Sequence, residues 1–178
     1  PARGRAYLHE FTEHFREYDA VLSQGELTER IAAATVTLIG DYHALPACQH
    51  FAAELIEASA RERRVVLGVE AVLARDQRIL DSWWRRQIPE DELRRRLRFD
   101  REWGYQWEPF YELLCSARDH TDGVYALDCM PREDLRRIRS RDRHAAAKIS
   151  EIRDRHPNAS MFVLFGESHL APQHLPRS

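Results

Sequence analysis

The sequence is poor in several residues whose abundance would mark a particular class of protein. Lysine occurs once, at Lys148, so nearly all of the 27 basic residues are arginine, and 29 acidic residues bring the formal net charge to −2. The arginines are spread along the chain among the acidic residues, as genomic base composition would produce. This balance gives no reason to expect a nucleic acid or an anionic membrane as a partner.

Cysteine is also scarce, and long apolar runs are missing. Cys48, Cys115 and Cys129 show no CxxC or Cys/His spacing, so we expect reduced thiols and no disulfide framework. No run approaches the roughly 18–20 apolar residues that a membrane-spanning helix needs. No signal-peptide pattern follows Pro1, so we expect a cytoplasmic protein, or an exported or membrane-anchored one if such a segment was removed.

What is present is a hydrophobic content of 43% in 178 residues, enough for one domain over residues 1–178. Strand-like segments alternate with amphipathic ones. We expect strands at residues 35–39, 64–70, 124–127 and 160–165, and helices at 5–22, 26–34, 74–86, 90–97, 109–118 and 132–155, with one more beginning at Pro46. The sequence therefore predicts an α/β fold with an open, mainly parallel four-stranded sheet flanked by helices, and with extra helices at the N-terminus and in the middle.

Polar side chains follow each expected strand. The first strand leads into Gly40-Asp41-Tyr42-His43 and the fourth into Gly166-Glu167-Ser168-His169, while the second and third end at Glu70 and Asp128. Ligands of open parallel sheets bind beyond the carboxyl ends of the strands, so we expect these groups to lie at one edge.

Imidazole and carboxylate groups suit a divalent transition metal such as zinc, manganese, iron or cobalt. We expect His43, Glu70 and His169 to hold the metal and to carry any catalysis, with Glu70 as a ligand or as the general base toward a metal-bound water. Asp41 and Glu167 would ligate the metal or orient the histidine rings from behind. The alternative is that each Gly-Asp or Gly-Glu pair only caps a following helix.

One carboxylate interrupts the apolar stripe of the expected helix at 132–155. Asp142 stands in this stripe between Ile138 and Ala145, and a carboxylate on a buried face needs a partner. The helix is longer than a strand, so Asp142 also qualifies as a metal ligand near the strand ends. We favour a structural pair with a nearby arginine such as Arg141.

The motifs, taken in their order along the chain, resemble those of the ChaN-like family of the Tiki/TraB/erythromycin-esterase superfamily. The resemblance covers about residues 27–172 and is carried by the two Gly-x-x-His motifs together with residues 66–70, 107–111, 126–132 and 139–145. It implies an α/β domain with a metal-associated site at His43, Glu70 and His169. The chain departs from the family pattern at Asp41, where Glu is usual, at Asp128, where Asn is common, and at His144, often a Met.

The resemblance implies two functions for such a site. ChaN-type members are described as haem-binding lipoproteins of iron acquisition, so we expect a haem or iron site in a cleft lined by His and Glu. The candidate cofactor contacts are a Tyr or His as axial ligand and an arginine for the propionates: Tyr42, Tyr105, Tyr111, His144 and Arg141. Tiki members are metal-dependent peptidases and erythromycin esterases hydrolyse a lactone with histidine and glutamate.

A metal-dependent hydrolase of an amide or ester bond is therefore the alternative, and a degenerate, non-catalytic interaction module is a second one. The expected cofactor is a divalent transition metal or haem. The expected partner is a small molecule, haem or a peptide, with no nucleic acid and no membrane span, and a homodimer is left open.

Overall fold

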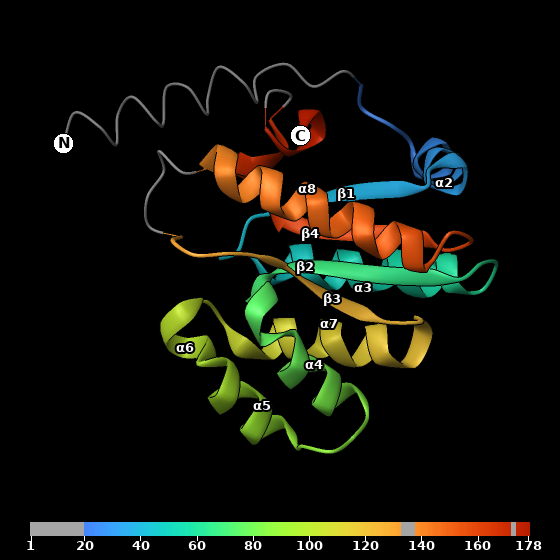
Figure 1. The fold of residues 1–178 in the computed structure, drawn as a ribbon. Helices are drawn as coiled ribbons and strands as arrows, with labels where there is room; N and C mark the ends of the chain where they lie inside the picture. The colour runs from blue at the N-terminus through green and yellow to red at the C-terminus, as the bar shows by residue number, and fades with distance from the viewer. Residues whose placement is uncertain (1–19, 133–137, 172–173) are drawn as a thin grey trace.

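The computed structural model describes residues 20–132, 138–171 and 174–178. Its sheet has four parallel strands in the order β1-β4-β2-β3, shown in Figure 1. The strands are β1 (Val36–Asp41), β2 (Val65–Leu73), β3 (Val124–Asp128) and β4 (Ser160–Gly166). The predicted fold class is confirmed. The helix expected at residues 5–22 falls mostly outside the described residues, and residues 20–23 are not helical.

Helices cover both faces of the sheet (Figure 1). On one side lie α3 (Pro46–Ala60) and α7 (Trp107–His120), extended by α4 (Gln77–Trp84), α5 (Glu90–Leu97) and α6 (Phe99–Glu102). The long helix α8 (Ile138–Arg155) lies on the other side. The other elements of the described residues are α2 (Gln24–Ala33), which leads into β1, and the short 3-10 helices η1 (Ala74–Asp76), η3 (Glu167–Leu170) and η4 (Leu175–Arg177).

The central strands supply two separate apolar cores. Because successive side chains of a strand point to opposite faces, Val65, Leu67 and Val69 join the core beneath α3 and α7, whereas Val66 joins the core beneath α8. A strand buried on both faces reads as a continuous apolar run, which is why residues 65–69 carry no polar side chain. No helix of the described residues is long and apolar enough to cross a membrane.

One short helix was not expected from the sequence. Arg98 adopts a left-handed backbone conformation with φ of 51°, ends α5 and starts α6. Such a helix end is usually marked by glycine or asparagine, and arginine gives no such signal. The resulting turn carries Trp103 and Tyr105 toward the carboxyl ends of the strands, where they contact His43.

The parallel strands end at one edge of the sheet. Asp41 at the end of β1 pairs in register with Gly166 at the end of β4. Between β2 and β3 the register shifts between Val69 and Leu73, and Glu70 lies within this irregularity. Such breaks in pairing re-aim side chains beside functional sites. The edge therefore gathers the polar residues that follow all four strands.

Candidate functional site

The outer pair of this edge consists of Asp41 and His43, which we call the outer dyad. His43 Nδ1 lies 2.8 Å from Asp41 Oδ2, and Gln49 Nε2 donates to the other carboxylate oxygen at 2.6 Å. A carboxylate oxygen accepts hydrogen bonds, so the Nδ1–H of His43 is the donor in this contact and Nε2 is the nitrogen turned toward Glu70. This nitrogen lies 3.8 Å from Glu70 Oε2.

The inner dyad consists of Asp142 and His169. His169 Nδ1 lies 2.5 Å from Asp142 Oδ1, and His174 Nδ1 lies 3.1 Å from the second oxygen of the same carboxylate. His169 Nε2 lies 3.5 Å from Glu70 Oε1. Two imidazoles, each oriented by its own aspartate, thus face the two oxygens of one glutamate.

Glu70 lies between the outer and inner dyads. We call Glu70 and these two dyads together the carboxyl-edge cluster. Its Oε1 accepts from Arg141 Nη2 at 2.6 Å, and its Oε2 accepts from the backbone N–H of Gly166. A Cβ on Gly166 would lie 2.8 Å from Glu70 Oε2 and 3.0 Å from His43 Nε2. The second Gly-x-x-His motif therefore needs its glycine to leave room for the carboxylate and the outer imidazole.

Two arginines balance the buried carboxylates. Arg141 donates from Nε to Asp128 Oδ1 at 2.9 Å and from Nη2 to Asp128 Oδ2 at 2.8 Å, in addition to its bond with Glu70. Arg132 donates to Asp128 Oδ2 at 2.6 Å and to the backbone carbonyls of Glu70 and Glu102 at 2.7 and 2.8 Å. The arginines therefore tie the ends of β2 and β3 to α6 and α8.

The pKa values of this network follow from its geometry. Burial acts to raise the pKa of Asp128, but the hydrogen bonds and charges of Arg141 and Arg132 together lower it below its ordinary value. Burial likewise acts to lower the pKa of Arg141, while Asp128 and Glu70 raise it. Both groups are therefore charged at neutral pH.

An aromatic rim lies over the outer dyad. The rings of Trp103 and Tyr105 lie 4.3 and 5.0 Å, centroid to centroid, from the His43 imidazole. The guanidinium of Arg132 stacks on Trp103 at 4.8 Å. Tyr105 is 44% exposed, and Tyr42, the neighbour of His43 in the chain, is 56% exposed. The outer dyad is thus the end of the cluster that a ligand can approach.

The structure brings together five of the six residues predicted to hold a metal: Asp41, His43, Glu70, Asp142 and His169. The sixth, Glu167, is half-buried in η3 and takes part in none of the hydrogen bonds or ion pairs of the cluster. Among the described residues, no three His, Cys, Asp or Glu side chains are arranged as metal ligands.

The residues predicted to contact a cofactor are dispersed. Tyr111 stacks on Trp107 at 5.4 Å beside the core, so it is a packing residue. His144 is half-buried on α8, and its buried Nε2 has no hydrogen-bond partner among the described residues. Arg141 is buried, and its hydrogen bonds go to Asp128 and Glu70. The favoured pairing of Asp142 with Arg141 was wrong, because two histidines occupy the Asp142 carboxylate.

Three further residues of the cluster were not identified from the sequence. Gln49 lies eight residues after Asp41, and Arg132 four residues after Asp128, so both contacts are local in the chain. His174 follows the second motif by five residues and carried no signal of its own, because its partner Asp142 lies on a distant helix.

A family model described as haem-binding uptake, Tiki superfamily, ChaN matches residues 27–160. The chain belongs to this family. No curated protein sequence matches it.

Solved structures share the fold of this ChaN-family chain at low sequence identity. The ChaN protein of Campylobacter jejuni, a cofacial heme binder, has 14% identity and a TM-score of 0.58, over 87% of this chain and 79% of that one. A MARTX toxin effector domain from Vibrio vulnificus has 18% identity and a TM-score of 0.57, over 85% of this chain and 31% of that one.

The C-terminal region of Pasteurella multocida toxin, described with a thiol-protease-like catalytic triad, has 14% identity and a TM-score of 0.63, over 90% of this chain. The chain spans only 24% of that protein. At these identities the comparison establishes a shared fold.

Proposed function

We propose that the carboxyl-edge cluster is an acid–base centre that hydrolyses an ester or amide bond. The observation that carries this proposal is the pair of imidazoles, His43 and His169, whose Nε2 atoms lie 3.8 and 3.5 Å from opposite oxygens of Glu70. An aspartate fixes each ring from its Nδ1 side. A histidine held in this way is suited to general acid–base catalysis.

His43 is the general base in this proposal because it is the reachable member of the cluster. Its side chain is 18% exposed, against 5% for Glu70 and 3% for His169. His43 Nε2 takes a proton from water as the water oxygen attacks the acyl carbon. The imidazolium then returns this proton to the leaving oxygen or nitrogen, so the ring ends the cycle neutral.

The carboxylates around His43 support this step electrostatically. The imidazolium lies between Asp41 and Glu70, whose negative charges stabilise it at short range. Glu70 stays available for this role because Arg141 and the Gly166 amide hold its two oxygens in place. His169 is a positioning residue that supports Glu70 from the buried side.

The cluster fits a divalent metal poorly. A metal ion between the two Nε2 atoms would need the oxygens of Glu70, but one of them already lies 2.6 Å from the Arg141 guanidinium and the other accepts the Gly166 amide. The positive charge of Arg141 occupies the place that a metal would take beside the carboxylate. The proposed hydrolysis therefore uses only the side chains of the cluster and water.

The aromatic rim favours a substrate with a flat apolar group next to the scissile bond. Trp103 and Tyr105 lie against His43, so such a group would stack on them with its acyl carbon near His43 Nε2. The similarity of fold to the toxin domains is consistent with an enzyme, although it does not identify the substrate.

Haem binding at the same rim is the second candidate, favoured by the family and by the exposure of Tyr42 and Tyr105. A tyrosine oxygen is an established axial ligand of haem iron, and both hydroxyls lie on half-exposed or exposed side chains. Haem bound here would supply a tyrosine-coordinated iron. Arg141 would not contact its propionates, because its donors serve Asp128 and Glu70.

The experiment measures turnover of a panel of p-nitrophenyl esters and p-nitroanilides by the wild type and Glu70→Gln. We expect the substitution to lower kcat by about 10²–10³-fold, the usual loss when one preorganised electrostatic contact of a catalytic site is removed. The matched control is Glu112→Gln, which alters another glutamate that pairs with a histidine, His50, on the exposed surface. Equal turnover by the wild type and Glu70→Gln would contradict the proposal.

Haemin titration of the same proteins separates the two candidates. Hydrolysis predicts turnover that depends on Glu70 whether or not haemin binds. A Soret band that is weakened by Tyr105→Phe or Tyr42→Phe, in protein without turnover on any substrate of the panel, would favour the haem site over the hydrolase.

A further inference from the structure

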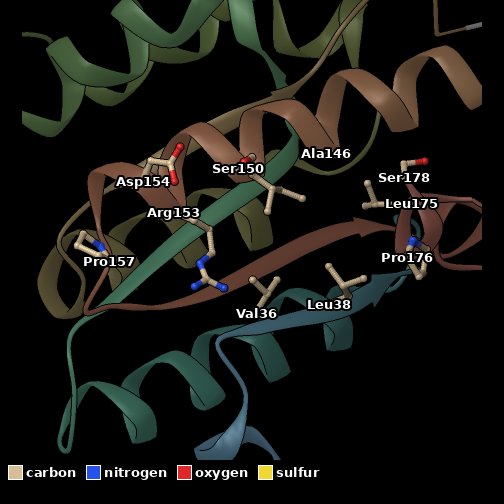
Figure 2. Close-up of a pocket in the computed structure, with 11 residues that line it drawn as sticks. Val36, Leu38, Ala146, Ser150, Arg153, Asp154, Pro157, Leu175, Pro176 and Ser178 are labelled. Carbon is tan, nitrogen blue, oxygen red and sulfur yellow. The ribbon is translucent and has the colours of Figure 1, made fainter.

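A concave surface lies away from the carboxyl-edge cluster, between α8 and the edge strand β1. This groove has a volume of about 800 Å³, within the usual range of small-molecule sites. Figure 2 shows its lining residues, which come from β1, α8, the turn after α8 and the C-terminal turn η4. We call it the α8 groove.

The floor of the α8 groove is apolar. Val36 and Leu38 point from β1 into it, and Ala146, Ile149 and Leu175 complete the surface. Both β1 residues remain half-buried, although the strands of a parallel sheet are normally covered on both faces. The groove therefore leaves apolar surface of the edge strand uncovered.

A single cation points into this apolar surface. The Arg153 side chain extends from α8 toward Val36, while Asp154, which also lines the groove, is exposed and directs its carboxylate away from Arg153 (Figure 2). Arg153 Nε is buried, and within the described part of the chain it has no hydrogen-bond partner and its guanidinium forms no ion pair. A buried donor without a partner is costly, so the position favours an anionic ligand.

From these observations we infer that the α8 groove binds an apolar carboxylate, with an aliphatic chain over Val36 and Leu38 and its carboxylate on Arg153. The planar guanidinium matches a carboxylate through two parallel hydrogen bonds. Helix α8 rises by about 12 Å between Ala146 and Asp154, which gives a medium-length chain room to lie along it.

The lining distinguishes this site from the haem site considered above. The residues around the groove include no His, Tyr, Cys or Met, so none of them offers an axial ligand to haem iron. The groove also takes no residue from the outer dyad. The inference is therefore independent of the proposed hydrolysis.

The test uses the full chain and sodium decanoate as the probe, titrated calorimetrically below its micellar concentration, with decan-1-ol as the neutral analogue. Decanoate is ionised at pH 7.5 because carboxyl groups titrate near pH 4–5 (a rough reference value). We expect saturable binding at one site that Arg153→Gln weakens by about 10- to 100-fold, as expected for loss of a charge-assisted pair. Decan-1-ol should bind more weakly and should not respond to this substitution.

Two further variants keep the test decisive. Arg143→Gln removes an exposed arginine from the same helix and should leave decanoate binding unchanged. Ala146→Phe should fill the groove and abolish binding of both probes. Decanoate binding that is insensitive to Arg153→Gln, or no binding of either probe by the wild type, would overturn the inference. The latter result would indicate that another part of the chain covers the groove.

Discussion

The two histidine–aspartate dyads use the same contacts but lie in different surroundings. In both dyads an aspartate holds Nδ1 and leaves Nε2 facing Glu70. The outer dyad stands under an aromatic rim that ligands can reach, whereas the inner dyad is enclosed between η3 and α8. The difference suggests a division of roles, in which His43 transfers protons and His169 fixes Glu70.

The largest expected effect separates the two histidines by their kinetics. His43→Gln should lower kcat by about 10²–10⁴-fold and the free energy of unfolding by less than about 1 kcal/mol, since water can replace its contacts. His169→Gln should lower kcat less and stability more. Turnover and urea unfolding of both variants would test this, with His50→Gln as the exposed control, and the reverse order would contradict the division of roles.

The next effect concerns Asp128, which anchors the arginines behind both dyads. Asp128→Asn leaves Arg141 and Arg132 buried without this carboxylate and should lower the free energy of unfolding at pH 7 by about 3–5 kcal/mol. Asp119→Asn, at an exposed position on α7, is the control and should change stability little. Urea unfolding curves would measure both.

The same pair of variants tests the sign of the pH dependence. The pKa of Asp128 is lowered in the folded protein, although burial alone would raise it. Its contribution to stability is therefore complete above the unfolded pKa of about 3.9 and is lost as the pH falls below that value. Wild type should lose more stability than Asp128→Asn in this range. If the free energies of unfolding of the wild type and Asp128→Asn fell by the same amount over this pH range, Asp128 would not be the group responsible.

A smaller effect compares the aspartates. Asp142 is fully buried and serves two histidines, so Asp142→Ala should lower the free energy of unfolding by about 1–3 kcal/mol. Asp41→Ala should cost less, about 1 kcal/mol: the buried Gln49 amide loses its acceptor, but His43 remains in contact with solvent. Thermal or urea unfolding would measure the difference, and a larger loss for Asp41→Ala would mean that the outer dyad is the more structural one.

The smallest effect concerns His174, the second partner of Asp142. His174→Ala removes one hydrogen bond at a half-buried position and should lower the free energy of unfolding by about 0.5–1 kcal/mol. We expect kcat to stay unchanged, because the other carboxylate oxygen of Asp142 still orients the His169 ring. A large fall in kcat without unfolding would give His174 a functional role.

The sequence was sufficient for the sheet and for most of the cluster. The apolar runs predicted the four strands, and the rule that parallel strands end at one edge brought Asp41, His43, Glu70 and His169 together. The polar interruption of an apolar stripe identified Asp142. These signals are local, or follow directly from the topology.

The partners within the cluster could not be predicted in the same way. Arg141 and Asp142 are neighbours in the chain, but the first faces Asp128 and Glu70 while the second faces His169. Consecutive residues of a helix point in directions about 100° apart, so their partners depend on where α8 lies over the sheet. For this reason the sequence did not predict that the Arg141 guanidinium lies beside Glu70, where it disfavours a metal.

The most direct test of the account is the metal content and the turnover of one chelator-treated sample of the wild-type protein. We expect full turnover on the best ester or anilide substrate with no near-stoichiometric transition metal, because the Arg141 guanidinium already pairs with the Glu70 oxygen that a metal would need. Turnover that is lost with the metal and restored in proportion to added metal would contradict it.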